Sequence, residues 1–179
     1  MKNVLKITII IFFLCQLVYS QTKKGAKELS IGASFMSRSY ENSDESWTAF
    51  NIPIRLGFCV NNNLEIEPEL LFNKYEEEDA GLIFSVNIAY NINSPGRSNP
   101  TVPFLLGGVG FSNTIVILPN YAHAGIEEGK GWTILNLGAG LKMFLSKTAA
   151  LRLEYRFQKY NGDSDLTYHN VLFGMSVFI

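Results

Sequence analysis

The feature that most constrains this chain is an alternation of apolar and polar residues that recurs in segment after segment. In "LRLEYRFQKY" (residues 151–160), the odd-numbered positions from 151 to 157 are apolar or aromatic, whereas the even-numbered positions from 152 to 158 carry charges or an amide. Successive side chains of a β-strand point to opposite faces, so a strand of this sequence has one apolar face and one charged face. Strict alternation over this length favours a strand over a helix.

Eight segments of this kind predict eight strands. Their approximate ranges are 27–40, 47–60, 64–75, 81–92, 101–114, 131–145, 149–160 and 167–179. The two faces of the Gly-rich fifth segment are not assigned by its pattern. The connections after the second, fourth and sixth segments ("NNN", "NSPGRSNP" and "SKT") are mostly tight and turn-like, and the other connections are longer or acidic. Short turns at one end and longer loops at the other are typical of a bacterial outer-membrane barrel.

Two arrangements can accommodate this pattern. A soluble barrel of lipocalin type would turn the apolar faces inward, whereas a membrane barrel turns them outward into lipid. An eight-stranded barrel is only just wide enough for side chains, so the many large apolar residues would overpack its interior. Glycines on the opposite face fit a narrow lumen; they are Gly32, Gly57, Gly138, Gly140 and Gly174. We therefore predict an all-β fold, an eight-stranded antiparallel up-and-down transmembrane β-barrel, whose closure satisfies every backbone polar group.

The polar faces of these segments carry both signs of charge. We predict that these side chains form a charge network in the lumen, where ion pairing and hydrogen bonding offset the cost of desolvation. The predicted members are Arg55, Glu65, Glu67, Glu69, Lys142, Arg152, Glu154 and Arg156.

The first twenty residues differ in character from the remainder. Lys2 and Lys6 precede an apolar run at 7–14, and Val18-Tyr19-Ser20 resembles a cleavage site, so residues 1–20 are predicted to be a secretory signal peptide and 21–179 the barrel domain. An uncleaved membrane anchor is the alternative. Cys15 lies in the signal segment, which leaves Cys59 as the only cysteine of the mature chain and excludes an internal disulfide and a Cys-rich metal site.

Composition limits the function classes. The whole chain has a formal net charge of −1, and removing the signal segment leaves 13 basic and 16 acidic residues, so nucleic-acid binding is not predicted. No cofactor and no resident metal are predicted. The acidic run at 76–79 could bind a divalent cation, but a solvated loop is the favoured interpretation.

Several aromatic residues near strand ends are predicted to form a membrane-interface girdle; they are Trp47, Tyr75, Tyr90, Trp132, Tyr160 and Tyr168.

Three segments resemble the small outer-membrane β-barrel family, whose members are similar to the transmembrane domain of outer-membrane protein A. They are "VPFLLGGVGFS" (102–112), "NLGAGLKMFLSKTAALRLEYRF" (136–157) and the closing "HNVLFGMSVFI". The resemblance covers essentially the whole mature chain. It implies a location in the outer membrane of a Gram-negative bacterium, among lipid and lipopolysaccharide. It also implies recognition of the last strand by the barrel-assembly machinery, through alternate apolar residues that usually end in Phe. Here the last residue is Ile179, and Phe178 comes one place early.

Some barrels of this size are enzymes. The chain bears a weaker resemblance to lipid A deacylases, which have a His-x-Ser arrangement where this chain has Lys159, Tyr160 and Asn161. Because the nucleophile and its base are missing there, no catalytic residue is predicted, and His169 and His123 are interpreted as structural or solvated. We predict a non-enzymatic, porin-like barrel with an envelope-structural or surface-binding role through its extracellular loops, and leave the ligand of the 115–130 loop open. The alternatives are a barrel-rim enzyme acting on envelope lipid and a narrow solute channel.

Overall fold

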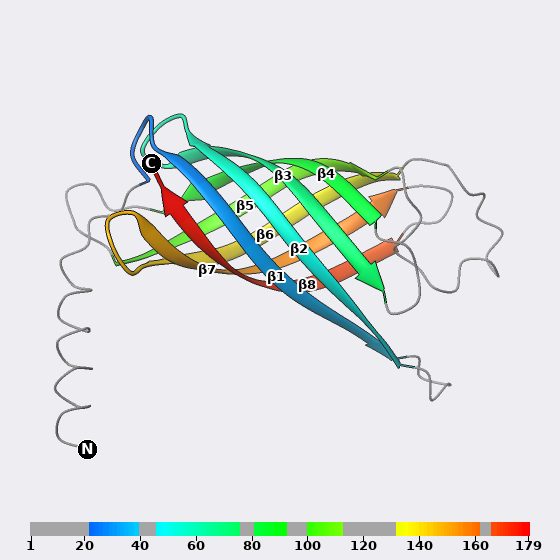
Figure 1. The fold of residues 1–179 in the computed structure, drawn as a ribbon. Helices are drawn as coiled ribbons and strands as arrows, with labels where there is room; N and C mark the ends of the chain where they lie inside the picture. The colour runs from blue at the N-terminus through cyan, green and yellow to red at the C-terminus, as the bar shows by residue number, and fades with distance from the viewer. Residues whose placement is uncertain (1–21, 40–45, 76–80, 93–99, 113–131, 162–165) are drawn as a thin grey trace, which may run out of the picture.

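The computed structural model describes residues 22–39, 46–75, 81–92, 100–112, 132–161 and 166–179. They form eight antiparallel strands in a closed barrel, in which each strand pairs with its neighbours in the chain and β1 pairs with β8 (Figure 1). The strands are β1 (Lys27–Ser39), β2 (Ser46–Cys59), β3 (Leu64–Tyr75), β4 (Gly81–Asn91), β5 (Thr101–Ser112), β6 (Trp132–Phe144), β7 (Ala149–Asn161) and β8 (Leu166–Phe178). The predicted fold class is confirmed, and the strand boundaries agree with the predicted ones to within two residues.

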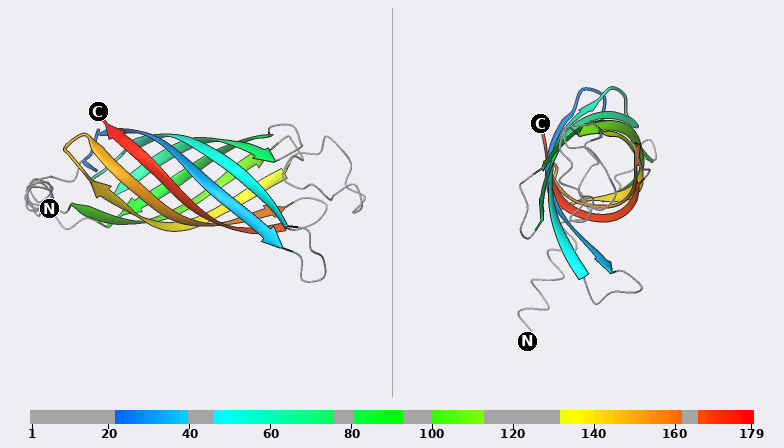
Figure 2. Two further views of the ribbon diagram at one scale, coloured as in Figure 1. Left: turned by 60° about the horizontal axis from the view of Figure 1, so that its bottom comes forward. Right: turned by 90° about the vertical axis from the view of Figure 1, so that its right-hand side faces the viewer.

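The two ends of the barrel differ. The C-terminus lies at the same end as the β2–β3 and β6–β7 turns, and the first described residues pair there with Cys59 (Figures 1 and 2). Seen along its length in the right-hand view of Figure 2, the barrel is a closed ring of strands. The N–H of Lys27 donates to the carbonyl of Ile179, and the N–H of Ile179 donates to the carbonyl of Lys27, which joins the first and last strands. Short turns mark the periplasmic end of the outer-membrane barrel that the sequence predicts, and on that basis we name the two ends periplasmic and extracellular.

The "NNN" turn is stabilised by a side chain. The Oδ1 atom of Asn61 accepts hydrogen bonds from the N–H groups of Asn63 and Leu64, each at 2.8 Å. Among the described residues, no residue other than glycine has a positive φ. Asparagine is therefore suited to this turn because its side chain replaces a backbone acceptor, and not because of its tolerance of positive φ.

Strand β4 shows how the alternation is realised. Its inward residues are buried and its outward residues are exposed at every position from Gly81 to Asn91. The outward set is apolar or aromatic: Leu82, Phe84, Val86, Ile88 and Tyr90. The described part of the chain contains no helix that is long and apolar enough to span a membrane.

Strand β5, whose faces the sequence left open, has apolar residues on both sides. Val102, Phe104 and Leu106 are buried in the lumen, whereas Leu105 and its outward neighbours face away from it. Phe104 has room because β6 has a glycine opposite it: a Cβ atom at Gly140 would lie 2.5 Å from the ring. The lumen therefore accepts large apolar side chains where a neighbouring strand supplies a glycine.

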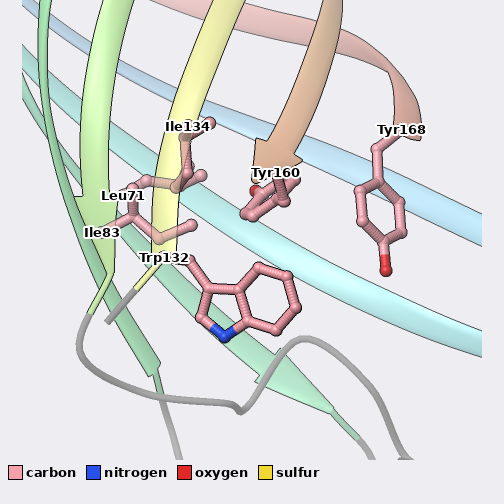
Figure 3. Packing of buried hydrophobic residues seen from close by; sticks show 6 residues of the cluster. All are labelled: Leu71, Ile83, Trp132, Ile134, Tyr160 and Tyr168. Carbon is pink, nitrogen blue, oxygen red and sulfur yellow. The ribbon is translucent and has the colours of Figure 1, made fainter. Parts of the chain in front are cut away.

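Apolar clusters occupy both ends of the lumen. The periplasmic cluster consists of Val102, Phe144, Ala150 and Phe178. The extracellular cluster consists of Leu71, Ile83, Trp132, Ile134, Tyr160 and Tyr168, which Figure 3 shows together. Between these two clusters lie the charged and amide side chains of the lumen.

The extracellular cluster corrects the predicted girdle. Trp132, Tyr160 and Tyr168 are only 4%, 3% and 5% exposed and point into the lumen, whereas Tyr90 is 51% exposed and faces outward as predicted. The three inward rings belong to the extracellular cluster, in which Tyr160 and Tyr168 meet edge to face with centroids 5.2 Å apart. The side chains of Trp47 and Tyr75 lie outside the described part of the structure.

Candidate functional site

The candidate site is the charged interior of the barrel. All eight residues of the predicted network lie on inward positions of β2, β3, β6 and β7, and all are buried. Alternation fixes the inward direction of each side chain, and the register of the strands fixes its height in the barrel. The ion pairs among these residues fall into three groups, each centred on one or two cations.

The first group is centred on Arg156. Its Nη1 and Nη2 atoms lie 2.5 and 3.0 Å from the two carboxylate oxygens of Glu69, which is a bidentate pair, and Nη2 also lies 2.5 Å from Glu154. Arg55 donates through Nε to the same Glu69 carboxylate, and its Nη2 lies 3.6 Å from Glu154. Two arginines and two glutamates thus form a closed square whose charges balance.

The second group is centred on Arg152, which reaches across the lumen from β7 to β3. Its Nη1 and Nη2 atoms each lie 2.8 Å from an oxygen of Glu67, a second bidentate pair. Its Nε donates to Glu154 at 3.0 Å, so that Glu154 links the first two groups. The guanidinium also lies 4.4 Å from the ring centroid of Phe104.

The third group is centred on Lys142, near the periplasmic end. Its ammonium donates to Glu28 at 2.5 Å and to Glu65 at 2.6 Å, and it lies 3.7 Å from Glu67. Glu28, Glu65 and Glu67 approach one another closely enough for oxygens of all three to lie within 4.8 Å. That spacing would suit a metal ion, but the ammonium of Lys142 already provides the positive charge among these carboxylates.

Glu28 is the functional residue that sequence reasoning missed. It is buried on β1, and besides pairing with Lys142 it accepts a hydrogen bond from the hydroxyl of Ser176 at 2.5 Å. The signal was present, since Glu28 shares its face with Ser30 and Gly32 and lies one step before the apolar series that starts at Leu29. Including it gives five carboxylates and four cations in the described lumen, which are Glu28, Glu65, Glu67, Glu69 and Glu154 with Arg55, Lys142, Arg152 and Arg156.

A chain of amides continues the network toward the extracellular end. Asn170 donates to Gln158 at 2.7 Å, Gln158 donates to Asn136 at 2.9 Å, and Asn136 donates to Asn87 at 2.9 Å. The last bond passes over β5, where Gly108 lies between Asn136 and Asn87 in register. A Cβ atom at Gly108 would lie 2.2 Å from the Asn87 side chain, so only glycine leaves space for this bond.

The remaining candidate residues of the sequence are not brought together. His169 faces outward on β8 and bonds to Tyr155, Tyr160 points into the lumen, and Asn161 is exposed at the end of β7. The other predicted features lie outside the described residues; they are the signal peptide at 1–20, the acidic run at 76–79, and the 115–130 loop with His123.

The last strand presents an apolar outer face. Its outward residues are Val171, Phe173, Met175, Val177 and Ile179. Phe178 instead points into the lumen, where its ring lies 5.1 Å from that of Phe144. The early phenylalanine therefore belongs to the periplasmic cluster, and the outward series ends in Ile179.

A closed barrel of eight strands with an apolar exterior and a charged interior identifies the family. The model of the outer membrane protein beta-barrel domain matches residues 8–177. The chain belongs to this family. It is a small barrel of the bacterial outer membrane, with its apolar face in the lipid of that membrane. No curated protein matches the sequence significantly.

Solved structures show the same fold at low sequence identity. The N-terminal β-barrel domain of OprF from Pseudomonas aeruginosa matches with a TM-score of 0.59 and 15% identity, over 87% of this chain and 98% of that one. Neisserial surface protein A matches with a TM-score of 0.56 and 13% identity, over 85% and 94% of the two chains. A de novo designed transmembrane β-barrel matches with a TM-score of 0.50 and 15% identity, over 88% and 98%.

Proposed function

We propose that this outer-membrane barrel is non-enzymatic, that its interior serves to hold the wall together, and that it acts in the envelope as a structural element or binds partners through its extracellular loops. The observation that carries the proposal is the filling of the described lumen. Paired charges and amides occupy its middle, and an apolar cluster occupies each end. Because these side chains contact one another inside the barrel, we propose that the extracellular end provides the surface that contacts partners.

The chemistry near β7 and β8 supports a non-enzymatic role. The positions that match the His-x-Ser arrangement of lipid A deacylases hold lysine, tyrosine and asparagine, and the tyrosine points into the lumen. Mass spectrometry of lipid A from cells with and without the protein tests this. We expect the same acyl chains in both, whereas an acyl change that disappears in a His169→Ala variant would overturn the proposal.

The filled lumen also argues against a solute channel. Eight strands leave space only for side chains, and here the charged ones are paired in the middle. In planar bilayers we expect the purified barrel to give no stable unitary current at neutral pH. Regular unitary currents would show that the lumen opens and would favour the channel alternative.

The loops and the last strand are the proposed contact sites. Replacing 115–130 by a short turn should abolish surface cross-links formed by the intact protein on living cells, while leaving the amount of folded barrel unchanged.

Recognition by the barrel-assembly machinery is proposed to depend on the outward series of β8. We therefore expect Val177→Asp to reduce the folded fraction in the outer membrane far more than Ser176→Ala, its inward neighbour.

A further inference from the structure

The outer wall of the barrel carries polar side chains from the middle of β7 to the extracellular ends of β7 and β8. Tyr155 and Lys159 lie on outward positions of β7, and Thr167 and His169 lie on outward positions of β8. We call these four residues the outer-wall patch. Lys159 is opposite Thr167 in register, and His169 is two residues further along, so the patch is continuous across two paired strands. These polar side chains lie beside apolar outward residues of the same two strands, such as Phe157 and Val171.

The imidazole of His169 is held in one orientation. Its Nδ1 atom lies 2.6 Å from the hydroxyl of Tyr155, and its ring contacts that of Phe157 edge to face with centroids 5.5 Å apart. We assign the tyrosine hydroxyl as the donor to Nδ1, because a phenolic O–H is a good donor and an unprotonated imidazole nitrogen is a good acceptor. The ring hydrogen then lies on Nε2. His169 is exposed, so the Nε2–H donor is presented to the surroundings of the barrel.

The position of His169 along the barrel axis places its Nε2–H donor at the boundary of the apolar band. On β8 the apolar outward series runs from Val171 to Ile179, and His169 is the next outward residue above it. Eight residue steps of a tilted strand rise roughly 20 Å, close to the ~25 Å apolar band of such barrels. His169 therefore lies where the acyl chains of the outer leaflet meet their headgroups. An N–H group at this depth is costly unless a headgroup oxygen accepts from it.

We propose that the outer-wall patch binds the phosphomonoester headgroup of an outer-leaflet lipid. The oriented Nε2–H of His169 and the hydroxyl of Thr167 supply hydrogen-bond donors, and the ammonium of Lys159 supplies positive charge on the same face. Phosphate oxygens are strong acceptors, and hydrogen bonds to a charged acceptor are stronger than those between neutral groups. The site lies on the barrel wall and not on the loops, so this inference goes beyond the proposed function and does not depend on it.

Native mass spectrometry of the full mature barrel tests the site. The barrel is incubated with equal amounts of lipid A, which carries phosphomonoesters, and phosphatidylcholine, and the ratio of the two bound lipids is measured. We expect wild-type protein to retain lipid A preferentially, and His169→Phe to reduce that preference about tenfold, the effect of losing one hydrogen bond to a charged group. Tyr155→Phe should reduce it less, because the ring stays but its orienting hydroxyl is lost.

Matched controls separate binding from folding. Tyr90→Phe changes an outward tyrosine near the periplasmic end, and Lys27→Gln changes a lysine there, so both should leave the lipid ratio unchanged.

A purely structural role of His169 would lower stability without changing the ratio, and that result would overturn the proposal. If the His169 variant fails to fold, wild-type protein that shows no preference for lipid A over its dephosphorylated form would overturn it as well. Displacement of lipid A by a large excess of free inorganic phosphate would contradict a lipid site. Failure of this test leaves the loop function untouched.

Discussion

The charged middle of the lumen and its extracellular cluster share the inward faces of β3, β6 and β7 but are stabilised differently. On β7, Arg156 is held by ion pairs with Glu69 and Glu154, whereas Tyr160, four residues further on, is held by ring packing against Tyr168. Ion pairs are directional, and each member depends on its partner, because an unpaired charge in the barrel is costly. Apolar packing depends on volume and area, so its loss is graded. The two regions should therefore respond differently to mutation.

The largest effect is expected in the charged region. Glu154→Leu removes a carboxylate that contacts three buried arginines, so each of them loses one of its partners, which should lower the free energy of unfolding by about 3–5 kcal/mol. Urea titration of the barrel in lipid vesicles, followed by tryptophan fluorescence, measures this change.

The matched double variant Glu154→Leu/Arg156→Leu sharpens the same test. Removing both partners keeps the pairs Arg55–Glu69 and Arg152–Glu67. We expect the double variant to be less destabilised than the sum of the two single variants. Strict additivity in this cycle would contradict the pairing that we describe.

A smaller, graded effect is expected in the extracellular cluster. Ile134 is fully buried there, so Ile134→Ala should lower the free energy of unfolding by about 2–5 kcal/mol, and Ile134→Val by only about 0.5–1.5 kcal/mol. The same urea titration compares both variants with wild type. Equal losses for the two substitutions would argue that position 134 is sensitive to shape and not to volume.

The smallest expected effect concerns the reactivity of the Cys59 thiol in the folded barrel. Cys59 is 4% exposed and inward, whereas its neighbour Val60 is 42% exposed and outward. In the folded barrel we expect a water-soluble maleimide to label Cys59 very slowly, and to label Val60→Cys in a Cys59→Ala background much faster. Rapid labelling of native Cys59 would show that the periplasmic end of the lumen is open.

Much of this structure could be predicted because a barrel strand has only two faces. The alternation predicted the strands, the closure and the inward direction of charged residues such as Arg156. The faces of β5 could not be predicted, since both are apolar and the space for Phe104 depends on Gly140 in another strand. The ion-pair partners also could not be predicted, because Arg152 pairs with Glu67 across the lumen and not along one strand.

The error about the girdle has a different origin. Their position near strand ends predicts a girdle role for Tyr160 and Trp132, but the alternation of each strand places both side chains on the inward face. Tyr160 shares its face with Arg156 and Gln158, and Trp132 shares its face with Lys142. Whether a residue is at an odd or an even position of its strand predicts its face better than its distance from the strand end, because a shift of one residue moves a side chain from lipid to lumen.

The most direct test of the apolar-outward, charged-inward arrangement uses single tryptophans in vesicles of lipid brominated on its acyl chains. One variant keeps only Trp132, which is inward on β6, and another carries only Val86→Trp, which is outward on β4. Bromine quenches fluorescence on contact, so we predict strong quenching at position 86 and little at Trp132. Strong quenching of Trp132 with little at position 86 would show that the two faces are reversed.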